Sequence, residues 1–186
     1  MMKRVLALFC CLFLMAPVMI AFAETTDEAD SEFDLSAEQQ RIEELGIPTV
    51  SSVATMKAEA DELWNNKDYE AAAIAYSEYA EQANWLANII SAGLEPYYSA
   101  SYDDRDNWYP DELSFTALAT AETTSNSYKS ERNRAMLYEG LCYYYLNDYE
   151  SALPLLINAL ELIEIEDEEN WGLGMEALYS IVGYNS

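Results

Sequence analysis

The segments Asn66-Lys-Asp-Tyr-Glu-Ala-Ala-Ala-Ile-Ala-Tyr76 and Asn147-Asp-Tyr-Glu-Ser-Ala-Leu-Pro-Leu-Leu156 decide the fold of this chain. Each begins with a short polar turn, continues with Asp-Tyr-Glu, and places a small residue three positions after the tyrosine and a large one four positions later. A helical pattern of about 13–15 residues precedes each segment, so we predict two helical hairpins. The turn aspartate can accept hydrogen bonds from free N–H groups of the second helix, and Ala72 and Ala152 allow close helix packing.

The rest of the chain is also predicted to be α-helical. From Ser52 onward no alternating strand pattern of useful length occurs, and Gly and Pro number only 6 and 5. Apolar residues in steps of three and four predict one long helix from about Asp68 to Gly93. A loop from Pro96 to Pro110 follows, and then a helix from about Asp111 to Thr124. Alternatively, these helices form a degenerate middle repeat with an inserted segment, and the sequence does not decide between the two.

This pattern resembles the tetratricopeptide repeat family, whose repeat length of 34 residues separates Gly140 from Gly174. The signature residues of the better repeat are Met136, Gly140, Tyr143, Ala152, Leu156 and Ala159, while Glu139 and Glu164 depart from the family pattern. Those of the first repeat are Met56, Ala60, Leu63, Ala72 and Tyr76, although Tyr79 is too large for its place. Leu173 and Gly174 match in a final half repeat.

The resemblance covers about residues 53–80 and 133–180. It implies an all-α fold: a short tetratricopeptide-like helical-hairpin solenoid with an aromatic-rich inserted loop. The alternative is an unrelated helical bundle with similar hairpin turns.

The composition excludes several classes of function. The chain carries 34 Asp+Glu, 9 Lys+Arg and no His, so its formal net charge is −25. Nucleic acid and anionic lipid repel such a chain, so we expect no nucleic-acid partner and electrostatic partners that are cationic or neutral. Without histidine, Ser-His-Asp catalysis and His-ligated zinc are excluded. At 51% hydrophobic residues, the chain is too apolar for a disordered tail.

Residues 1–23 have the pattern of a secretory signal peptide. A basic start, Met1–Arg4, precedes an apolar run of 19 residues that ends Ala21-Phe-Ala23, before the acidic sequence at Glu24. We expect cleavage after Ala23, which gives a secreted or extracytoplasmic protein with a net charge of −27. The alternative is an uncleaved signal anchor, and only that form would contact a membrane.

The mature chain is predicted to have two parts. Residues 24–50 form an acidic lead-in with one short helix, which starts at a capping box at Ser36 and stops near Gly46. Residues 51–186 form the tetratricopeptide-like domain. After cleavage Cys142 is the only cysteine, so no intramolecular disulfide can form.

The family resemblance implies a partner-binding groove lined by the first helix of each hairpin. The residues expected there, beside Lys57 and Asp61, are Trp64, Arg134, Leu137, Leu141, Tyr144, Tyr145, Trp171 and Tyr179. Aromatic residues on rigid helices make good anchors, because they offer a large contact area at low entropy cost. The alternative is that each of these side chains packs into the core.

The loop from Pro96 to Pro110 is a second candidate site. Its aromatic and basic residues are Tyr97, Tyr98, Tyr102, Arg105, Trp108 and Tyr109. They either pack onto the helices as an ordered plug, or present an aromatic and acidic surface to a sugar or a cationic peptide. A third interpretation, calcium held by Asp103, Asp104, Asp106 and Asp111, lacks the glycine and distal glutamate of an EF-hand loop.

No catalytic arrangement is predicted. Cys142 has no base near it in sequence, and the carboxylates are too numerous for any pair to be singled out. The acidic run Glu161–Glu169 is interpreted as a solvated helix face that could also steer a basic partner. We therefore expect a non-catalytic, exported binding module without cofactor or metal. Charge complementarity favours a cationic protein or peptide as its partner. The alternative is a glycan-binding protein that uses residues 96–110.

Overall fold

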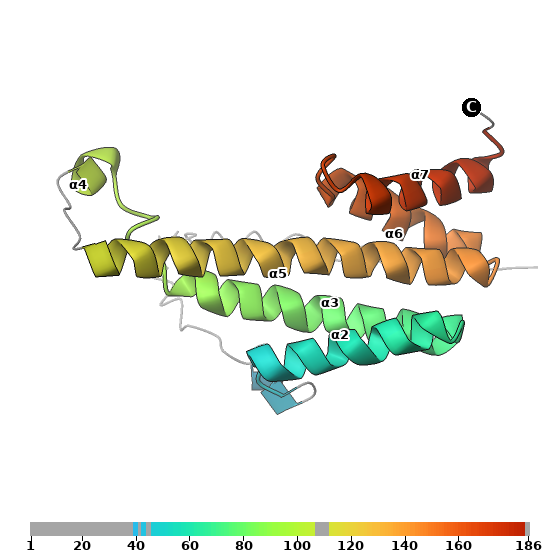
Figure 1. Ribbon diagram of the computed structural model, residues 1–186, viewed down its shortest axis with the longest axis horizontal. Helices are drawn as coiled ribbons and strands as arrows, with labels where there is room; N and C mark the ends of the chain where they lie inside the picture. The colour runs from blue at the N-terminus through green and yellow to red at the C-terminus, as the bar shows by residue number, and fades with distance from the viewer. Residues whose placement is uncertain (1–38, 41, 44–45, 107–111, 185–186) are drawn as a thin grey trace, which may run out of the picture.

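The chain is all-α in the residues that the computed structural model describes, 39–40, 42–43, 46–106 and 112–184 (Figure 1). Its helices are α2 (Val50–Asn65), α3 (Tyr69–Ala92), α4 (Tyr102–Asp106), α5 (Glu112–Tyr145), α6 (Tyr149–Leu162) and α7 (Glu168–Val182), and this part contains no strand. The all-α prediction is therefore confirmed. The predicted signal peptide and most of the acidic lead-in lie outside the described residues.

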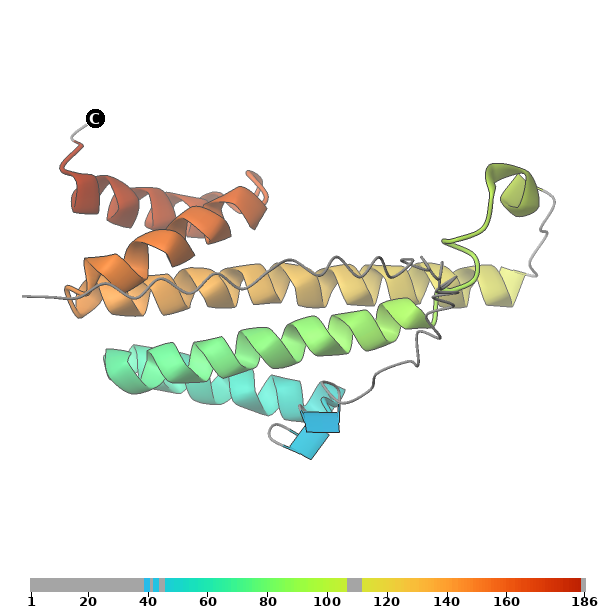
Figure 2. The same cartoon turned by 180° about the vertical axis from the view of Figure 1, so that it is seen from behind.

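Helix α5 forms the long axis of the molecule, and two helical hairpins pack against it (Figure 1). The α2–α3 hairpin lies along one side of α5, and the α6–α7 hairpin lies along the other. Helices α2 and α7 face the viewer in Figure 1, whereas α3 and α6 face the viewer in the reverse view of Figure 2. One face of the molecule is therefore built from α2, α5 and α7. Among the described residues, no helix has the length and apolar character needed to span a lipid bilayer.

The turn between α2 and α3 and the turn between α5 and α6 have the structure that their sequences predict. Asp68 is the N-cap of α3 and accepts a hydrogen bond from the Ala71 N–H, at 3.3 Å. Asp148 is the N-cap of α6 and accepts one from the Ser151 N–H, at 3.2 Å. The small residues after the turns, Ala72 and Ala152, are fully buried. Both capping aspartates and both close helix contacts are thus confirmed.

Helix α5 corrects one prediction. A separate helix ending near Thr124 is wrong, because a single helix of 34 residues continues through the Ser- and Thr-rich segment to Tyr145. The Thr120, Thr123 and Thr124 hydroxyls each donate to the carbonyl four residues earlier, at 2.8 Å, which removes their competition with the helix. Ser125 is 1% exposed and donates to the Ala87 carbonyl of α3, at 3.0 Å. Contact with α3 therefore keeps the helix continuous where local propensity is weak. The long helix predicted from about Asp68 to Gly93 is confirmed as α3.

Two glycines allow the helices around the α6–α7 hairpin to approach closely. A Cβ atom built on Gly140 of α5 would lie 3.1 Å from the Leu155 Cβ and Leu156 Cδ2 atoms of α6. A Cβ atom on Gly174 of α7 would lie 2.9 Å from Leu137 Cδ1 and Leu160 Cδ2. These two glycines, which lie one repeat length apart, are therefore both sites of tight helix packing.

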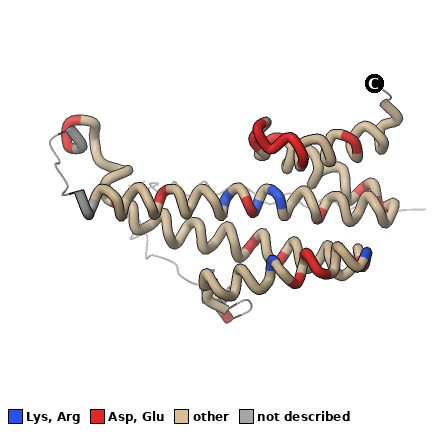
Figure 3. Tube along the Cα trace, in the orientation of Figure 1, with Lys and Arg blue, Asp and Glu red and all other residues tan. Residues whose placement is uncertain are grey.

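Charge is unevenly distributed along the described chain (Figure 3). Acidic residues concentrate around the turn between α6 and α7, where Glu164, Glu166, Glu168 and Glu169 are exposed. Basic residues lie in α2, in the turn after it and in the middle of α5. The face built from α2, α5 and α7 thus combines a few cations with an acidic edge.

Candidate functional site

A cleft opens on the face built from α2, α5 and α7. It has a volume of about 360 Å³, and we call it the central cleft. Its lining residues are Lys57, Asp61, Trp64, Asn65, Tyr76, Tyr79, Glu131, Arg134, Ala135, Tyr138 and Asn170. These residues come from α2, α3, α5 and α7, so the cleft exists only when the helices on both sides of α5 are in place.

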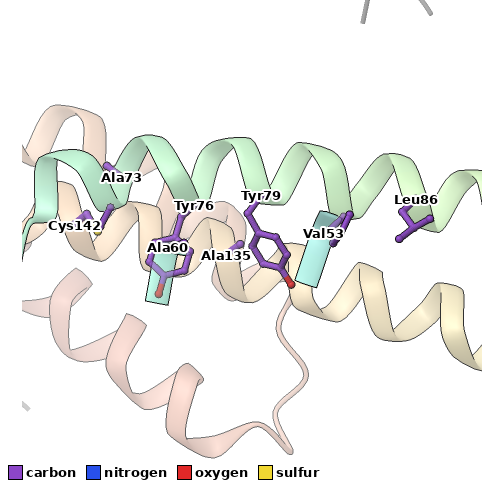
Figure 4. Packing of buried hydrophobic residues seen from close by; sticks show 10 residues of the cluster. Val53, Ala60, Ala73, Tyr76, Tyr79, Leu86, Ala135 and Cys142 are labelled. Carbon is purple, nitrogen blue, oxygen red and sulfur yellow. The ribbon is translucent and has the colours of Figure 1, made fainter. Parts of the chain in front are cut away.

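Tyr76 and Tyr79 of α3 form the floor of the central cleft. Both are 3% exposed, and their hydroxyl groups point away from α3, past Ala60 and Ala135 (Figure 4). The Tyr76 hydroxyl donates to Asp61 Oδ1 at 2.8 Å, and the Tyr79 hydroxyl donates to Glu131 Oε2 at 3.3 Å. Tyr79, too large for an ordinary repeat, thus reaches across to α5. Burial, together with the facing carboxylates, raises the pKa of both phenols above their usual range.

Three ion pairs flank this floor, one on α2 and two made by Arg134 of α5. On α2, Lys57 Nζ donates to Asp61 Oδ2 at 2.8 Å, one helical turn away. Burial disfavours the charged ammonium, but the bond and charge of Asp61 outweigh it and raise the pKa of Lys57. On α5, Arg134 donates to Glu131 Oε1 at 2.8 Å and to Asp167 Oδ2 at 2.7 Å. The cations in the lining are therefore already paired with carboxylates of this chain.

Asn170 and Asp167 connect α7 to the same network. Asn170 Nδ2 donates to both Asp167 oxygens, at 3.0 and 3.1 Å. Burial opposes ionisation of Asp167, but its bonds from Arg134 and Asn170 prevail and lower the pKa of the carboxyl. The other end of the Asn170 amide differs, because its Oδ1 atom is buried and has no hydrogen-bond partner. Asn170 thus holds a buried acceptor that makes no hydrogen bond.

Aromatic rings border the polar network. The Trp64 and Tyr138 rings meet edge to face, with centroids 4.9 Å apart, and Tyr138 stacks on Tyr76 at 5.3 Å. Burial raises the pKa of the Tyr138 phenol, and the negative charges of Glu169 and Asp61 raise it further. Aromatic rings therefore lie beside the ion pairs of the central cleft.

The predicted groove residues fall into three groups. Trp64 and Arg134 line the central cleft. Leu137 and Leu141 do not: they are 0% and 3% exposed in a core cluster with Ala152, Leu156 and Ala159. The prediction that these two leucines face a groove is wrong, because the close approach of α6 and α7 at the two glycines buries that side of α5.

The remaining predicted groove residues lie outside the cleft. Tyr145 is 47% exposed and stacks on Tyr69, with centroids 4.8 Å apart. Tyr144 donates to the Ser180 hydroxyl at 3.0 Å, which ties α5 to α7. Trp171 is 37% exposed on α7, and Tyr179 packs against Tyr184 near the end of that helix. These aromatic residues occupy the surface beside the turns.

Sequence reasoning missed seven cleft residues: Asn65, Tyr76, Tyr79, Glu131, Ala135, Tyr138 and Asn170. Helical spacing from Arg134 contained a signal for two of them, because Glu131 lies three residues before it and Tyr138 four residues after it. The tyrosines of α3 gave no such signal, since they come from the second helix of a hairpin. Asn170 adjoins the predicted Trp171 but faces a different side of α7.

The loop after α3 contributes to a second cavity. Its volume is about 510 Å³, and the lining residues are Leu94, Glu95, Pro96, Tyr97, Ser99, Ala100, Asp104 and Leu118. Of the predicted loop residues, Tyr97 thus lines this cavity. Tyr98 is 40% exposed and Tyr102 is 78% exposed. Trp108, Tyr109 and the side chain of Arg105 lie outside the described residues.

No group of three or more Cys, Asp or Glu side chains that could hold a metal ion occurs in the described part of the chain. Of the four aspartates considered for calcium, Asp111 and the Asp106 side chain lie outside that part.

Comparison of the chain with protein-family models, with curated proteins and with solved structures finds no match.

Proposed function

We propose that this protein is an exported, non-catalytic scaffold with a tetratricopeptide-like solenoid, and that it binds an extended segment of a cationic protein in the central cleft. The observation that carries the proposal is the cleft itself, which combines aromatic rings with paired ions. Such a mixture of apolar faces and a few fixed polar groups is typical of binding sites.

The helix arrangement supports the solenoid interpretation. Helices α2, α5 and α7 face one side of the molecule, and helices α3 and α6 face the other (Figures 1 and 2). Gly140 and Gly174, 34 residues apart, are both sites of close helix packing. Stacked hairpins of this kind leave an elongated surface on which a partner segment can lie.

The charges favour a cationic partner. The chain has a net charge of −25, and exposed glutamates of the α6–α7 turn lie on the α7 side of the cleft. Such an edge speeds the encounter with a basic partner, and its effect falls as salt rises.

The lining groups support binding rather than catalysis. Asp61 accepts hydrogen bonds from Tyr76 and Lys57, and Glu131 accepts them from Tyr79 and Arg134. Each of these carboxylates is therefore held by two donors of this chain, one a tyrosine hydroxyl and one a cation.

A matched pair of asparagines tests the proposal. Asn65 is exposed and lines the central cleft, whereas Asn88 is exposed on α3 away from it. Immobilised wild-type protein, Asn65→Trp and Asn88→Trp would be compared for capture from extracellular and envelope fractions, with elution in rising salt. We expect Asn65→Trp to lose the salt-eluted partner and Asn88→Trp to retain it. Equal capture by both variants would remove the cleft from the function.

The second cavity favours one other candidate function, glycan binding by the loop. Its lining is largely apolar, with Tyr97 and Pro96 beside Ser99 and Asp104, a combination suited to the faces and hydroxyls of a neutral sugar. Tyr97→Ala would then abolish retention of polysaccharide, elution would need free sugar rather than salt, and Asn65→Trp would have no effect.

A further inference from the structure

Helix α7 has a row of apolar side chains that belongs to neither hydrophobic core cluster in the described part of the chain. The row recurs at steps of four, three and four residues, so its members share one face of the helix: Trp171, Met175, Leu178 and Val182. Trp171 is 37% exposed, Val182 is 60% exposed, and the two residues between them are partly buried. The α7 residues that pack on the core are others, namely Leu173, Ala177 and Ile181. Helix α7 therefore has a second apolar face, turned away from the core.

Helix α6 extends this face. Leu160 lies against α7, because a Cβ atom built on Gly174 would be 2.9 Å from the Leu160 Cδ2 atom. Ile157 precedes Leu160 by three residues, on the same side of α6, and is 40% exposed. We call Ile157, Leu160 and the four α7 residues of the row the α6–α7 surface. The lining of the central cleft includes none of them, so the two surfaces are separate.

The charges around the α6–α7 surface all have one sign. Residues 149–182 contain Asp and Glu but no Lys or Arg, and Figure 3 accordingly shows only acidic positions on this hairpin. Glu161 follows Ile157 by one helical turn, Glu168 precedes Trp171 by one, and both glutamates are exposed. The turn between the helices adds further exposed glutamates. The apolar surface therefore has an acidic border at the end nearest this turn.

This charge decides among the possible occupants of the surface. A second copy of the chain would bring one acidic hairpin against another, and such like-charge contacts oppose pairing. An anionic membrane is repelled for the same reason. A helix with an apolar face and neighbouring basic residues matches both features, because it covers the apolar row and meets the glutamates with opposite charge. The row from Trp171 to Val182 extends over about 17 Å, which is roughly three turns of such a helix.

We infer that the α6–α7 surface binds a basic amphipathic helix of a partner protein. The apolar face of that helix packs on the row of α7 and on Ile157 of α6. Its basic residues lie at the end nearest the α6–α7 turn, beside Glu161 and Glu168. This inference goes beyond the proposed function, which concerns the central cleft, and either of the two can fail alone.

Two peptides of identical composition test the inference. Each has about 16 residues, half leucine and half lysine, with both ends blocked. In the first peptide, pairs of leucines and pairs of lysines alternate, so leucine forms one helical face; in the second, the order spreads leucine around the helix. Isothermal titration calorimetry with the purified protein, at about 0.15 M salt, would measure binding. We expect the first peptide to bind at least about tenfold more tightly than the second, with a negative change in heat capacity from apolar burial.

A matched pair of isoleucines locates the site. Ile157 of α6 and Ile89 of α3 are 40% and 44% exposed, so the same substitution is tolerated similarly at both positions. Ile157→Arg should weaken binding of the first peptide at least about tenfold, because it removes an apolar contact and repels the lysines. Ile89→Arg should leave binding unchanged. Thermal melts of both variants show whether the fold is retained.

A matched pair of charge changes tests the acidic border. The double variant Glu161→Gln with Glu168→Gln should weaken binding of the first peptide several-fold. The double variant Glu59→Gln with Glu78→Gln, at exposed positions of α2 and α3, changes the net charge equally and should have little effect. Equal losses in the two double variants would mean that the overall charge attracts the peptide, which would overturn the inference.

Three further results would overturn it. Equal binding of the two peptides would mean that no apolar helical face is recognised. If Asn65→Trp weakened binding as much as Ile157→Arg does, the peptide would lie in the central cleft. Sedimentation at high salt, where charge repulsion is screened, examines the second copy as occupant. We expect a monomer, and a dimer that Ile157→Arg dissociates would assign the surface to self-association instead.

Discussion

At the scale of single residues, the α2–α3 turn and the α5–α6 turn place different side chains in the same backbone conformation. Lys67 has a φ of 61° and Asn147 a φ of 62°, both in the left-handed region. Asparagine tolerates this region, because its short polar side chain can bond locally, whereas lysine has no such compensation. The first turn therefore holds strain that the second turn avoids.

Replacing Lys67 with glycine should relieve this strain. Because a side chain in the left-handed region costs roughly 1–2 kcal/mol, we expect Lys67→Gly to raise the free energy of unfolding by about 1 kcal/mol. The neighbouring Asn66 has a φ of −78°, so Asn66→Gly should lower it by about 0.5–1 kcal/mol. Urea denaturation of both variants measures the difference. Equal effects of the two substitutions would contradict the strain argument.

Glu139 of α5 should make stability depend on pH. Burial raises the pKa of its carboxyl despite a hydrogen bond from Ser77, so folding favours the protonated form. The ionised group therefore opposes folding at neutral pH, and this penalty disappears as pH falls from the raised pKa to the unfolded value of about 4.3. We expect Glu139→Gln to be more stable than wild type at pH 7.

The quantity to measure is the difference in free energy of unfolding between Glu139→Gln and the wild type at each pH. Lower pH also reduces repulsion among the other acidic residues, but it does so in both proteins. Urea denaturation at pH 7, 5.5 and 4 should show the advantage of Glu139→Gln shrinking towards zero. An advantage that stays constant with pH would mean that ionisation of Glu139 is not its cause.

At the scale of elements, two glycines of α7 make opposite contributions. Gly172 has no atom within 4 Å of the position its Cβ would take, whereas a Cβ on Gly174 would meet Leu137 and Leu160 at 2.9 Å. Gly172→Ala should stabilise the protein by roughly 1 kcal/mol through helix propensity. Gly174→Ala should destabilise it by about 1–2 kcal/mol, because overpacking of the α5–α6–α7 contact exceeds the same propensity gain.

Thermal denaturation of these two variants compares them in one helix under identical conditions. If Gly174→Ala stabilised the protein as much as Gly172→Ala does, α7 would pack less closely on α5 and α6 than the structure shows.

The elements differ in how far their sequences predict them. The capped turns and α3 were predictable, because Asp-Tyr-Glu and the steps of three and four residues are local signals. The continuity of α5 was not, because Thr123–Ser127 is poor in apolar residues and strong helix formers. What keeps this segment helical is contact with α3, where Ser125 bonds to the Ala87 carbonyl and lies 2.6 Å from the Ser91 hydroxyl. Contacts between distant segments leave no periodic trace in one sequence.

The same limit applies to the site. Trp64 and Arg134 were predictable as cleft residues from the family resemblance, which places them on the first helices of hairpins. Leu137 and Leu141 share that helix face in sequence, and only the approach of α6 and α7 to α5 separates them from the cleft. Tyr79 looked too large for its position until its hydroxyl was placed against Glu131.

At the scale of the whole molecule, α5 belongs to both packed units. It contacts α3 on one side and α6 and α7 on the other, and each hydrophobic cluster contains residues of α5. A helix shared in this way couples the two hairpins, so we expect the protein to unfold as a single cooperative unit.

Single-tryptophan variants test this cooperativity. Trp64 reports on α2 and Trp171 on α7, so variants that retain only one of them follow the two sides separately. Both should give the same unfolding midpoint. Leu156→Ala, which removes a fully buried side chain of α6, should lower both midpoints together, with a loss of about 2–5 kcal/mol. If Leu156→Ala lowered only the unfolding midpoint that Trp171 reports, the two hairpins would unfold as independent units.

The unbroken course of α5 also sets a length. A helix of 34 residues spans about 50 Å, because each residue adds about 1.5 Å. The α4 segment lies beside one end of this rod, and the α6–α7 hairpin lies towards the other (Figure 1). The helix is therefore a spacer as well as part of the core. Molecules bound at the two ends of α5 would not collide. The number of residues in this one helix would fix the distance between them.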